Sequence, residues 1–220
     1  MLNETRRFVP FRPYRRDREM SREMSTSSES ATQSQGRRNQ KSRRALLTAL
    51  EELLVENPLT SISIEGIAER AGVGKQTIYR WYRDRSELFI DLYETRSIDQ
   101  LMIPDRGSVE RELNELAVQT WRLWRDTACG RAFGQLVART QTSPEELERF
   151  RDEFMPRRRT LVEQVLRRGV ERGEVRDADH EVFIDLWIGF NWHHLLMNKL
   201  ADESVIPRMV DMLLEGMMVD

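Results

Sequence analysis

Residues 63–82, SIEGIAERAGVGKQTIYRWY, constrain the fold most, because their pattern predicts two short helices joined by a tight turn. In the first half, Ile64 and Ile67 are three residues apart and share one helix face. Ser63 precedes that face at the position of an N-cap. Gly72 follows it, where a helix needs a left-handed residue to end and turn the chain. The stretch therefore predicts a helical hairpin.

The second helix of this hairpin is expected from about Gly74 to Trp81. At about 100° per residue, Ile78 and Tyr82 fall on one side and can pack against the first helix. The opposite side combines amide, hydroxyl, cationic and aromatic groups, which suits a helix that lies in the major groove of DNA. We predict base contacts from Gln76, Thr77 and Arg80, and phosphate contacts from Lys41, Ser63, Lys75, Tyr79 and Trp81. The alternative is an ordinary hairpin whose polar face is solvated.

The longer segment IAERAGVGKQTIYRWYRDRSELF closely resembles the helix-turn-helix of the tetracycline-repressor-like (TetR) family of transcriptional regulators. The residues that match the family pattern are Ser63, Ile67, Ala68, Ala71, Gly72, Val73, Thr77, Ile78, Tyr79, Tyr82, Glu87 and Leu88. Gly74 departs from it by replacing the usual Ser cap of the recognition helix, and Trp81-Tyr82 replaces the usual His-Phe. The resemblance implies a regulator of pseudo-palindromic double-stranded DNA whose C-terminal domain forms a homodimer and binds a small effector.

Charge and cysteine content agree with a DNA-binding module joined to a second domain. Residues 1–96 hold 18 Lys and Arg against 14 Asp and Glu, whereas residues 97–220 hold 17 against 23. The single cysteine, Cys129, cannot form an internal disulfide, which indicates a reducing compartment. No apolar run is long enough to span a membrane, and the N-terminal residues have no apolar run after their positive charges and so do not resemble a secretory signal. We therefore expect a cytoplasmic protein.

Helical periodicity without strand-like alternation predicts an all-α protein of about nine helices. We divide it into a disordered basic tail (1–36), a helix-turn-helix DNA-binding domain (37–83) and a helical ligand-binding and dimerisation domain (84–220). The first helix is expected over 38–56, and Pro156 should break or kink a later one. The Arg-rich tail has three open interpretations: an arm on DNA phosphates, a solvated tail, or a segment before the true start at Met20 or Met24.

The C-terminal half is rich in aromatic residues and methionine, which can build a core or surround an apolar cavity. As guesses for the wall of a ligand pocket we select Trp121, Trp124, Phe150, Phe154 and Trp187. The last two predicted helices, 179–200 and 202–218, are apolar on a wide arc, so each needs a second burial partner. We expect that partner to be another copy of the chain, through Phe183, Phe190, Met209, Val210, Leu213 and Met217.

Residues that could support catalysis or hold a metal form no recognisable pattern. His193 and His194 are adjacent on a helix and point in different directions. Neither has His, Asp, Glu or Cys three or four positions away. We therefore expect no enzyme, no metal and no cofactor. The alternatives to an effector-controlled repressor are a ligand-independent regulator, a protein-interaction module and, more remotely, an enzyme.

Overall fold

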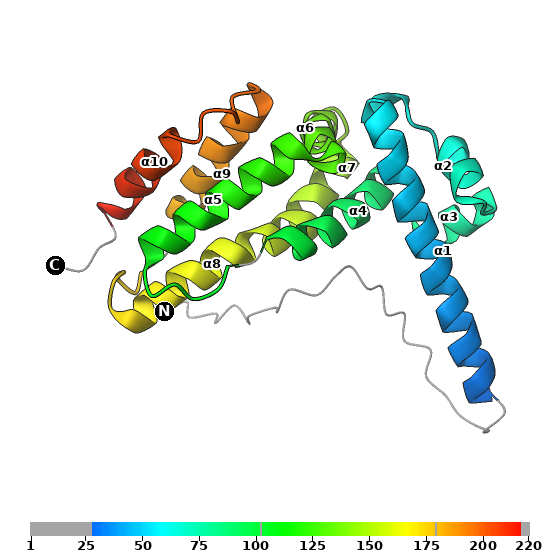
Figure 1. Cartoon of the computed structure of the whole chain (residues 1–220), viewed down its shortest axis with the longest axis horizontal. Coiled ribbons are helices and arrows are strands. Elements are labelled where there is room, and N and C mark those ends of the chain that lie inside the picture. The colour runs from blue at the N-terminus through cyan, green and yellow to red at the C-terminus, as the bar shows by residue number, and fades with distance from the viewer. Residues whose placement is uncertain (1–27, 102, 179, 217–220) are drawn as a thin grey trace. The chain divides into compact units, whose positions relative to one another are not determined.

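The computed structural model describes residues 28–101, 103–178 and 180–216. Every regular element in these ranges is helical and none is a β-strand, which confirms the all-α fold (Figure 1). The elements are α1 (Ser28–Glu56), η1 (Leu59–Ser61), α2 (Ile64–Ala71), α3 (Lys75–Trp81), α4 (Arg85–Gln100), α5 (Val109–Asp126), α6 (Ala128–Thr140), α7 (Pro144–Arg149), η2 (Phe150–Phe154), α8 (Met155–Arg172), α9 (Glu181–Leu196) and α10 (Val205–Leu214).

The chain divides into two compact units, and the division falls within α4, after Thr95. We call them the N-terminal unit and the C-terminal unit. The sequence analysis placed this boundary after residue 83. In the N-terminal unit, α1, α2, α3 and α4 each contribute apolar side chains to one core. Its fully buried members include Leu46, Leu50, Ile67, Ile78, Leu88 and Leu92.

α1 begins earlier than the sequence predicts, at Ser28 instead of Arg38. Residues 28–36, which were expected to be disordered, are therefore helical, while residues 1–27 of the expected tail lie outside the described part. The polar run at the start of α1 carries no apolar period, so pattern reading misses it. Once a helical nucleus exists downstream, however, extending it by further residues costs little.

α5 is the centre of the C-terminal unit, where it packs against α6, α8, α9 and α10 (Figure 1). The start of α5 approaches α8 so closely that a Cβ on Gly169 would lie 2.1 Å from Val109 Cγ2. Beside this contact, the fully buried Glu112 accepts a hydrogen bond from Arg168 Nε at 2.8 Å. Arg172 Nη1 lies 3.3 Å from the other oxygen of that carboxylate. The ion pairs compensate the burial of the carboxylate and join α5 to α8.

Pro156 lies near the start of α8, directly after the π-helical turn η2. A proline lacks the N–H that an α-helix needs and its ring crowds the preceding turn. A π-helical turn widens the helix locally and relieves that conflict. Phe150 and Met155 keep right-handed helical dihedral angles, so α7, η2 and α8 form one continuous helical stretch instead of ending at the proline.

Candidate functional site

Local hydrogen bonds fix both ends of α2 and thereby the turn into α3. Ser63 Oγ accepts a hydrogen bond from the Gly66 N–H at 3.1 Å, which caps the start of α2. At the other end Gly72 has a φ of 64°, and the Val73 N–H donates to the Ala68 carbonyl at 3.0 Å. This is a Schellman ending, in which a residue with a Cβ would be strained at the glycine position. The turn therefore fixes how α3 leaves α2.

α3 turns an apolar side to its unit and a polar side to solvent. Ile78 is fully buried, and Tyr82, directly after the helix, is 4% exposed. Gly74 caps the helix start without a side-chain hydrogen bond. Of the α3 side chains predicted to contact DNA, Lys75, Gln76, Tyr79 and Arg80 are exposed, and Thr77 and Trp81 are half-buried. The Arg80 guanidinium lies 5.5 Å from the Trp81 ring centre, so a cation–π contact can hold it.

Lys75 is paired with an acidic side chain that the sequence analysis did not select. Its Nζ donates to Glu65 Oε1 on α2 at 2.6 Å. This hydrogen bond raises the pKa of Lys75 and lowers the pKa of Glu65. Both side chains are at least half exposed, so solvent and salt screen the pair. A DNA phosphate can therefore replace Glu65 as the partner of Lys75.

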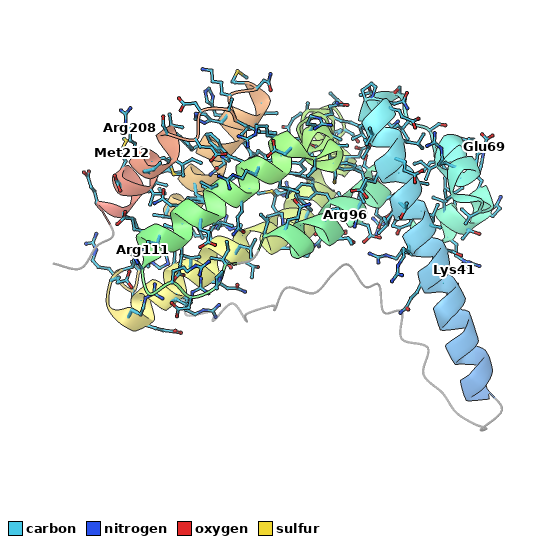
Figure 2. All side chains as sticks on the ribbon, in the orientation of Figure 1. Lys41, Glu69, Arg96, Arg111, Arg208 and Met212 are labelled. Atoms are coloured by element: carbon cyan, nitrogen blue, oxygen red, sulfur yellow. The ribbon has the colours of Figure 1, made fainter. Side chains whose placement is uncertain are left out.

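A shallow groove of ≈ 380 Å³ lies between α1 and the end of α2, and it carries a second group of cations. Lys41 and Arg44 line it from successive turns of α1, together with Arg70 from α2. Arg70 is paired with Glu56 at 3.0 Å, whereas no described residue pairs with Lys41 or Arg44. Figure 2 shows Lys41 projecting from α1. Two exposed cations one turn apart suit a phosphate backbone.

The five aromatic residues predicted to line a pocket are all buried in the C-terminal unit, where they belong to packed clusters. These residues are Trp121, Trp124, Phe150, Phe154 and Trp187. Trp121 Nε1 donates to Asn191 Oδ1 at 2.6 Å, and its ring stacks on Phe190 at 6.3 Å. Phe150 and Phe154 stack on each other at 4.8 Å. Such contacts are those of a solid core.

Trp124 also lines an open pocket of ≈ 560 Å³ in the same unit, together with residues of α5, α6, α9 and the loop after α9. The apolar part of its wall includes Leu195 and Leu200. The polar part includes Gln135, whose Oε1 is buried and has no hydrogen-bond partner among the described residues. This volume is within the range of small-molecule sites.

The residues predicted to form a dimer interface fall into three groups. Phe183, Met209 and Val210 are buried inside the protomer, Phe190 and Leu213 are half-buried, and Met217 lies outside the described residues. The exposed apolar side chains of α9 and α10 are different ones. Val182, Leu186 and Met212 are 71%, 56% and 75% exposed, respectively. Figure 2 shows Met212 on the outer side of α10.

The part of the chain that the structure describes includes no helix that is long and apolar enough to cross a membrane. It contains no group of three or more His, Cys, Asp or Glu side chains that could hold a metal ion.

Two family models match the chain. The model for bacterial regulatory proteins of the tetR family matches residues 46–92, which include the hairpin described above. The model for the tetracyclin repressor-like C-terminal domain matches residues 103–213.

Individual proteins agree with these matches. The uncharacterized HTH-type transcriptional regulator YdeS of Bacillus subtilis (strain 168) is 30% identical over 161 residues, covering 73% of this chain and 81% of that protein. The HTH-type transcriptional regulator AqdR of Rhodococcus erythropolis is 28% identical, covering 79% and 84%. The crystal structure of the TetR family transcription regulator SCO0332 is 29% identical with a TM-score of 0.69, covering 80% and 98%. These matches confirm the resemblance seen in the sequence, and the chain belongs to the TetR family of helix-turn-helix transcriptional regulators.

Proposed function

We propose that this regulator is a homodimeric repressor that leaves a pseudo-palindromic operator when a small, largely apolar ligand binds its C-terminal unit. The observation that carries the proposal is the exposed polar face of α3, held on a helix whose other face is buried. Gln76 and Arg80 can donate to base edges in the major groove, where Arg discriminates guanine and Gln discriminates adenine. Thr77 lies next to them and completes the proposed reading face.

Phosphate contacts would fix the position of this face on the duplex. Lys75 is the first cation of α3, and Tyr79 and Trp81 flank the reading face. Lys41 lines the groove on α1, and Ser63 is at the start of α2. The Ser63 oxygen already accepts the capping hydrogen bond, but its hydroxyl hydrogen remains available to a phosphate oxygen. These contacts supply affinity without sequence preference.

The proposed dimer forms through the exposed stripe of α9 together with α10. Val182, Leu186, Gly189 and His193 follow one another on α9 at intervals of three or four residues, and all four are exposed. Gly189 has open space where a Cβ would be, so nothing inside the protomer requires a glycine there. Glycine within a helix costs about 0.5–1 kcal/mol relative to alanine. Close approach of a second helix would explain that cost, and a two-fold axis there matches a palindromic operator.

The proposed ligand site is the ≈ 560 Å³ pocket that Trp124 lines. An apolar ligand body fits against Trp124, Leu195 and Leu200, and a donor group on the ligand would satisfy Gln135 Oε1. Two proteins with this fold are described with small ligands: FadR of Bacillus subtilis with stearoyl-CoA, and SmeT with triclosan. Both are below 25% identity to this chain, so they support the capacity of the fold and not a particular ligand.

Release would follow from a shift in population. Two recognition helices bind together only when their separation matches one turn of DNA, about 34 Å. A ligand that binds a differently spaced dimer more tightly moves the population away from the DNA-binding form. A ~100-fold preference supplies about 2.7 kcal/mol of coupling.

The experiment begins with the selection of operators from random DNA. Arg80→Ala should then relax the sequence preference at one position of each half-site, at a cost of about 1–3 kcal/mol if Arg80 reads a guanine. Apolar compounds are titrated next, and operator release is followed. Gly134→Leu should fill the pocket from α6 and abolish release while operator binding persists, because Gly134 lines the pocket wall. Unchanged binding by Arg80→Ala would reject the reading face, and unchanged release by Gly134→Leu would reject the pocket.

A further inference from the structure

A buried carboxylate, Asp91, lies on α4 within hydrogen-bonding distance of Tyr82, the residue that follows α3. Asp91 is 3% exposed, and its neighbours on the same helix face, Leu88 and Leu92, are fully buried. A carboxylate in such surroundings is costly unless charge and hydrogen bonds compensate its lost hydration. The contacts of Asp91 therefore show what it holds together.

Two donors from separate segments meet at this carboxylate. Arg43 of α1 donates to Asp91 Oδ2 through Nε at 2.8 Å and to Oδ1 through Nη2, which is a bidentate pair. Tyr82 Oη donates to Oδ2 at 2.5 Å. Thr95 Oγ1 donates to the Asp91 backbone carbonyl at 2.8 Å and accepts a long hydrogen bond from Arg43 Nη2 at 3.4 Å, but it does not touch the carboxylate. The cluster joins α1, α4 and the residue that ends α3.

The two side chains that donate to Asp91 both keep their protons. Burial, followed by the charge of Asp91, raises the pKa of Tyr82 far above its ordinary value, so the phenol remains a donor. The hydrogen bond to Asp91 raises the pKa of Arg43, which remains a cation. Tyr82 and Arg43 are therefore both donors toward Asp91.

Tyr82 connects this cluster to the recognition helix. It is the C-cap of α3, and its N–H donates to the Ile78 carbonyl at 2.9 Å. The buried side chains of Ile78 and Tyr82 anchor α3, but apolar packing is non-directional and allows small rotations about the helix axis. A hydrogen bond to an acceptor that Arg43 holds in place restricts that rotation. A rotation of α3 would move Gln76 and Arg80 away from the bases.

We propose that Asp91 and Tyr82 are positioning residues for operator recognition: their hydrogen bond sets the orientation of α3, and Arg43 holds Asp91 in place. The role goes beyond the proposed function, because neither residue contacts DNA or ligand. It also gives a purpose to Tyr82, which stands where the family pattern usually has Phe. Contacts to base edges depend on position within a fraction of an ångström, whereas a flexible Lys can follow a phosphate. Loss of the hydrogen bond should therefore lower discrimination and spare non-specific binding.

The test is Tyr82→Phe, which keeps the ring and removes the hydroxyl. The discrimination ratio, defined as the Kd for random DNA divided by the Kd for the selected operator, is measured at one fixed salt concentration. It should fall about fivefold or more, the size of a weakened bidentate base contact, while the Kd for random DNA stays within twofold. Thr95→Val is the matched control, because it removes a hydroxyl that reaches the side chains of the cluster only through a long hydrogen bond from Arg43 and leaves the bonds of Arg43 and Tyr82 to the carboxylate in place. Its ratio should equal that of wild type.

Two further measurements separate positioning from general stability. With 5-fluorotryptophan incorporated, the fluorine resonance of Trp81 should shift in Tyr82→Phe. The resonances of Trp121, Trp124, Trp187 and Trp192, which all belong to the C-terminal unit, should remain in place. Asp91→Asn removes the charge that Arg43 holds and replaces one acceptor oxygen by a donor amide, so its discrimination ratio should fall at least as far as that of Tyr82→Phe.

The proposal is overturned if Tyr82→Phe discriminates like wild type. It is equally overturned if both Kd values rise together as the unfolding midpoint falls, which indicates a structural role alone, or if Asp91→Asn keeps the discrimination ratio of wild type.

Discussion

Replacing Leu186 by Asp tests whether the exposed stripe of α9 joins two copies of the chain. Leu186 is 56% exposed in the protomer. Complete burial of a leucine side chain is worth about 1.5–3 kcal/mol, so roughly 1–1.5 kcal/mol remains to be gained when a partner covers it. A two-fold dimer contains the residue twice, which makes the loss of apolar burial about 2–3 kcal/mol. The dissociation constant should therefore rise by at least about 30-fold.

Two buried carboxylates would add to this penalty, because each must lose hydration without a partner. Sedimentation velocity over nanomolar to micromolar protein concentration measures the monomer–dimer equilibrium directly. Far-ultraviolet circular dichroism should show an unchanged helical protomer, since the substituted side chain faces solvent there. Operator affinity should fall in parallel, because a monomer can occupy only one half-site.

Val55→Asp is the matched control, because Val55 is 70% exposed on α1 and lies outside the stripe. It should dimerise like wild type. Val210→Asp is expected to behave differently from both, since Val210 is fully buried in its own protomer and a charge there should unfold the C-terminal unit. A Leu186→Asp protein with the dimer affinity of wild type, or a Val55→Asp protein equally monomeric, would refute the assignment of the interface.

Three further predictions concern Gly189, the Lys75 to Glu65 pair and the Asn191 to Trp121 hydrogen bond. Gly189→Leu should raise the melting temperature of the monomeric protomer slightly, because leucine has a higher helix propensity than glycine and the site is open. The same change should weaken the dimer in sedimentation experiments, and a tighter dimer would contradict the proposed close approach of two helices. Lys75→Ala should weaken binding to all DNA and reduce the slope of log K against log salt by about 0.9 per protomer. Glu65→Gln should instead strengthen DNA binding, most strongly at low salt. Fluorescence anisotropy at several salt concentrations measures both effects. Asn191→Leu should lower the free energy of unfolding, measured in urea, by about 1–3 kcal/mol, because Trp121 Nε1 loses its acceptor. The double variant with Trp121→Phe should recover part of that loss.

The helix-turn-helix could be predicted from the sequence because its signals act locally. Ser63 caps the N–H of Gly66, and Gly72 turns the chain within one residue. The periodicity of Ile64, Ile67 and Ile78 specifies which faces are buried without reference to the rest of the chain. Neither the Lys75 to Glu65 pair nor the Asp91 cluster has such a signal, since each depends on how separate helices are packed. An acidic residue inside the apolar stripe of α4 was the available hint for Asp91.

The proposed dimer face could not be predicted from the sequence for a different reason. α9 is apolar on almost its whole circumference, so the sequence indicates two buried faces but not which of them belongs to the protomer. Phe183 and Leu186 are both apolar and less than one turn apart, yet the first is 5% exposed and the second 56%. α9 packs against α5, α8 and α10, and the side of α9 that carries Leu186 remains exposed. The aromatic residues of α5 and η2 pose the same problem, because core packing and a cavity wall require the same side chains.

The Asp91 cluster also restricts how a ligand could release the operator. Arg43, Tyr82 and Asp91 tie α1, the end of α3 and α4 together with directional bonds, and Leu46, Ile78 and other fully buried side chains fill the space between these helices. Turning α3 alone would break the Tyr82 to Asp91 hydrogen bond, whose acceptor is a buried charge, at a cost of about 1.5–3 kcal/mol, and would also disturb the packing of Ile78. A ~100-fold ligand preference supplies only about 2.7 kcal/mol. That hydrogen bond alone would take up most of the coupling, so in the proposed repressor we expect the ligand to change the separation of two intact N-terminal units instead of rotating α3 within its unit.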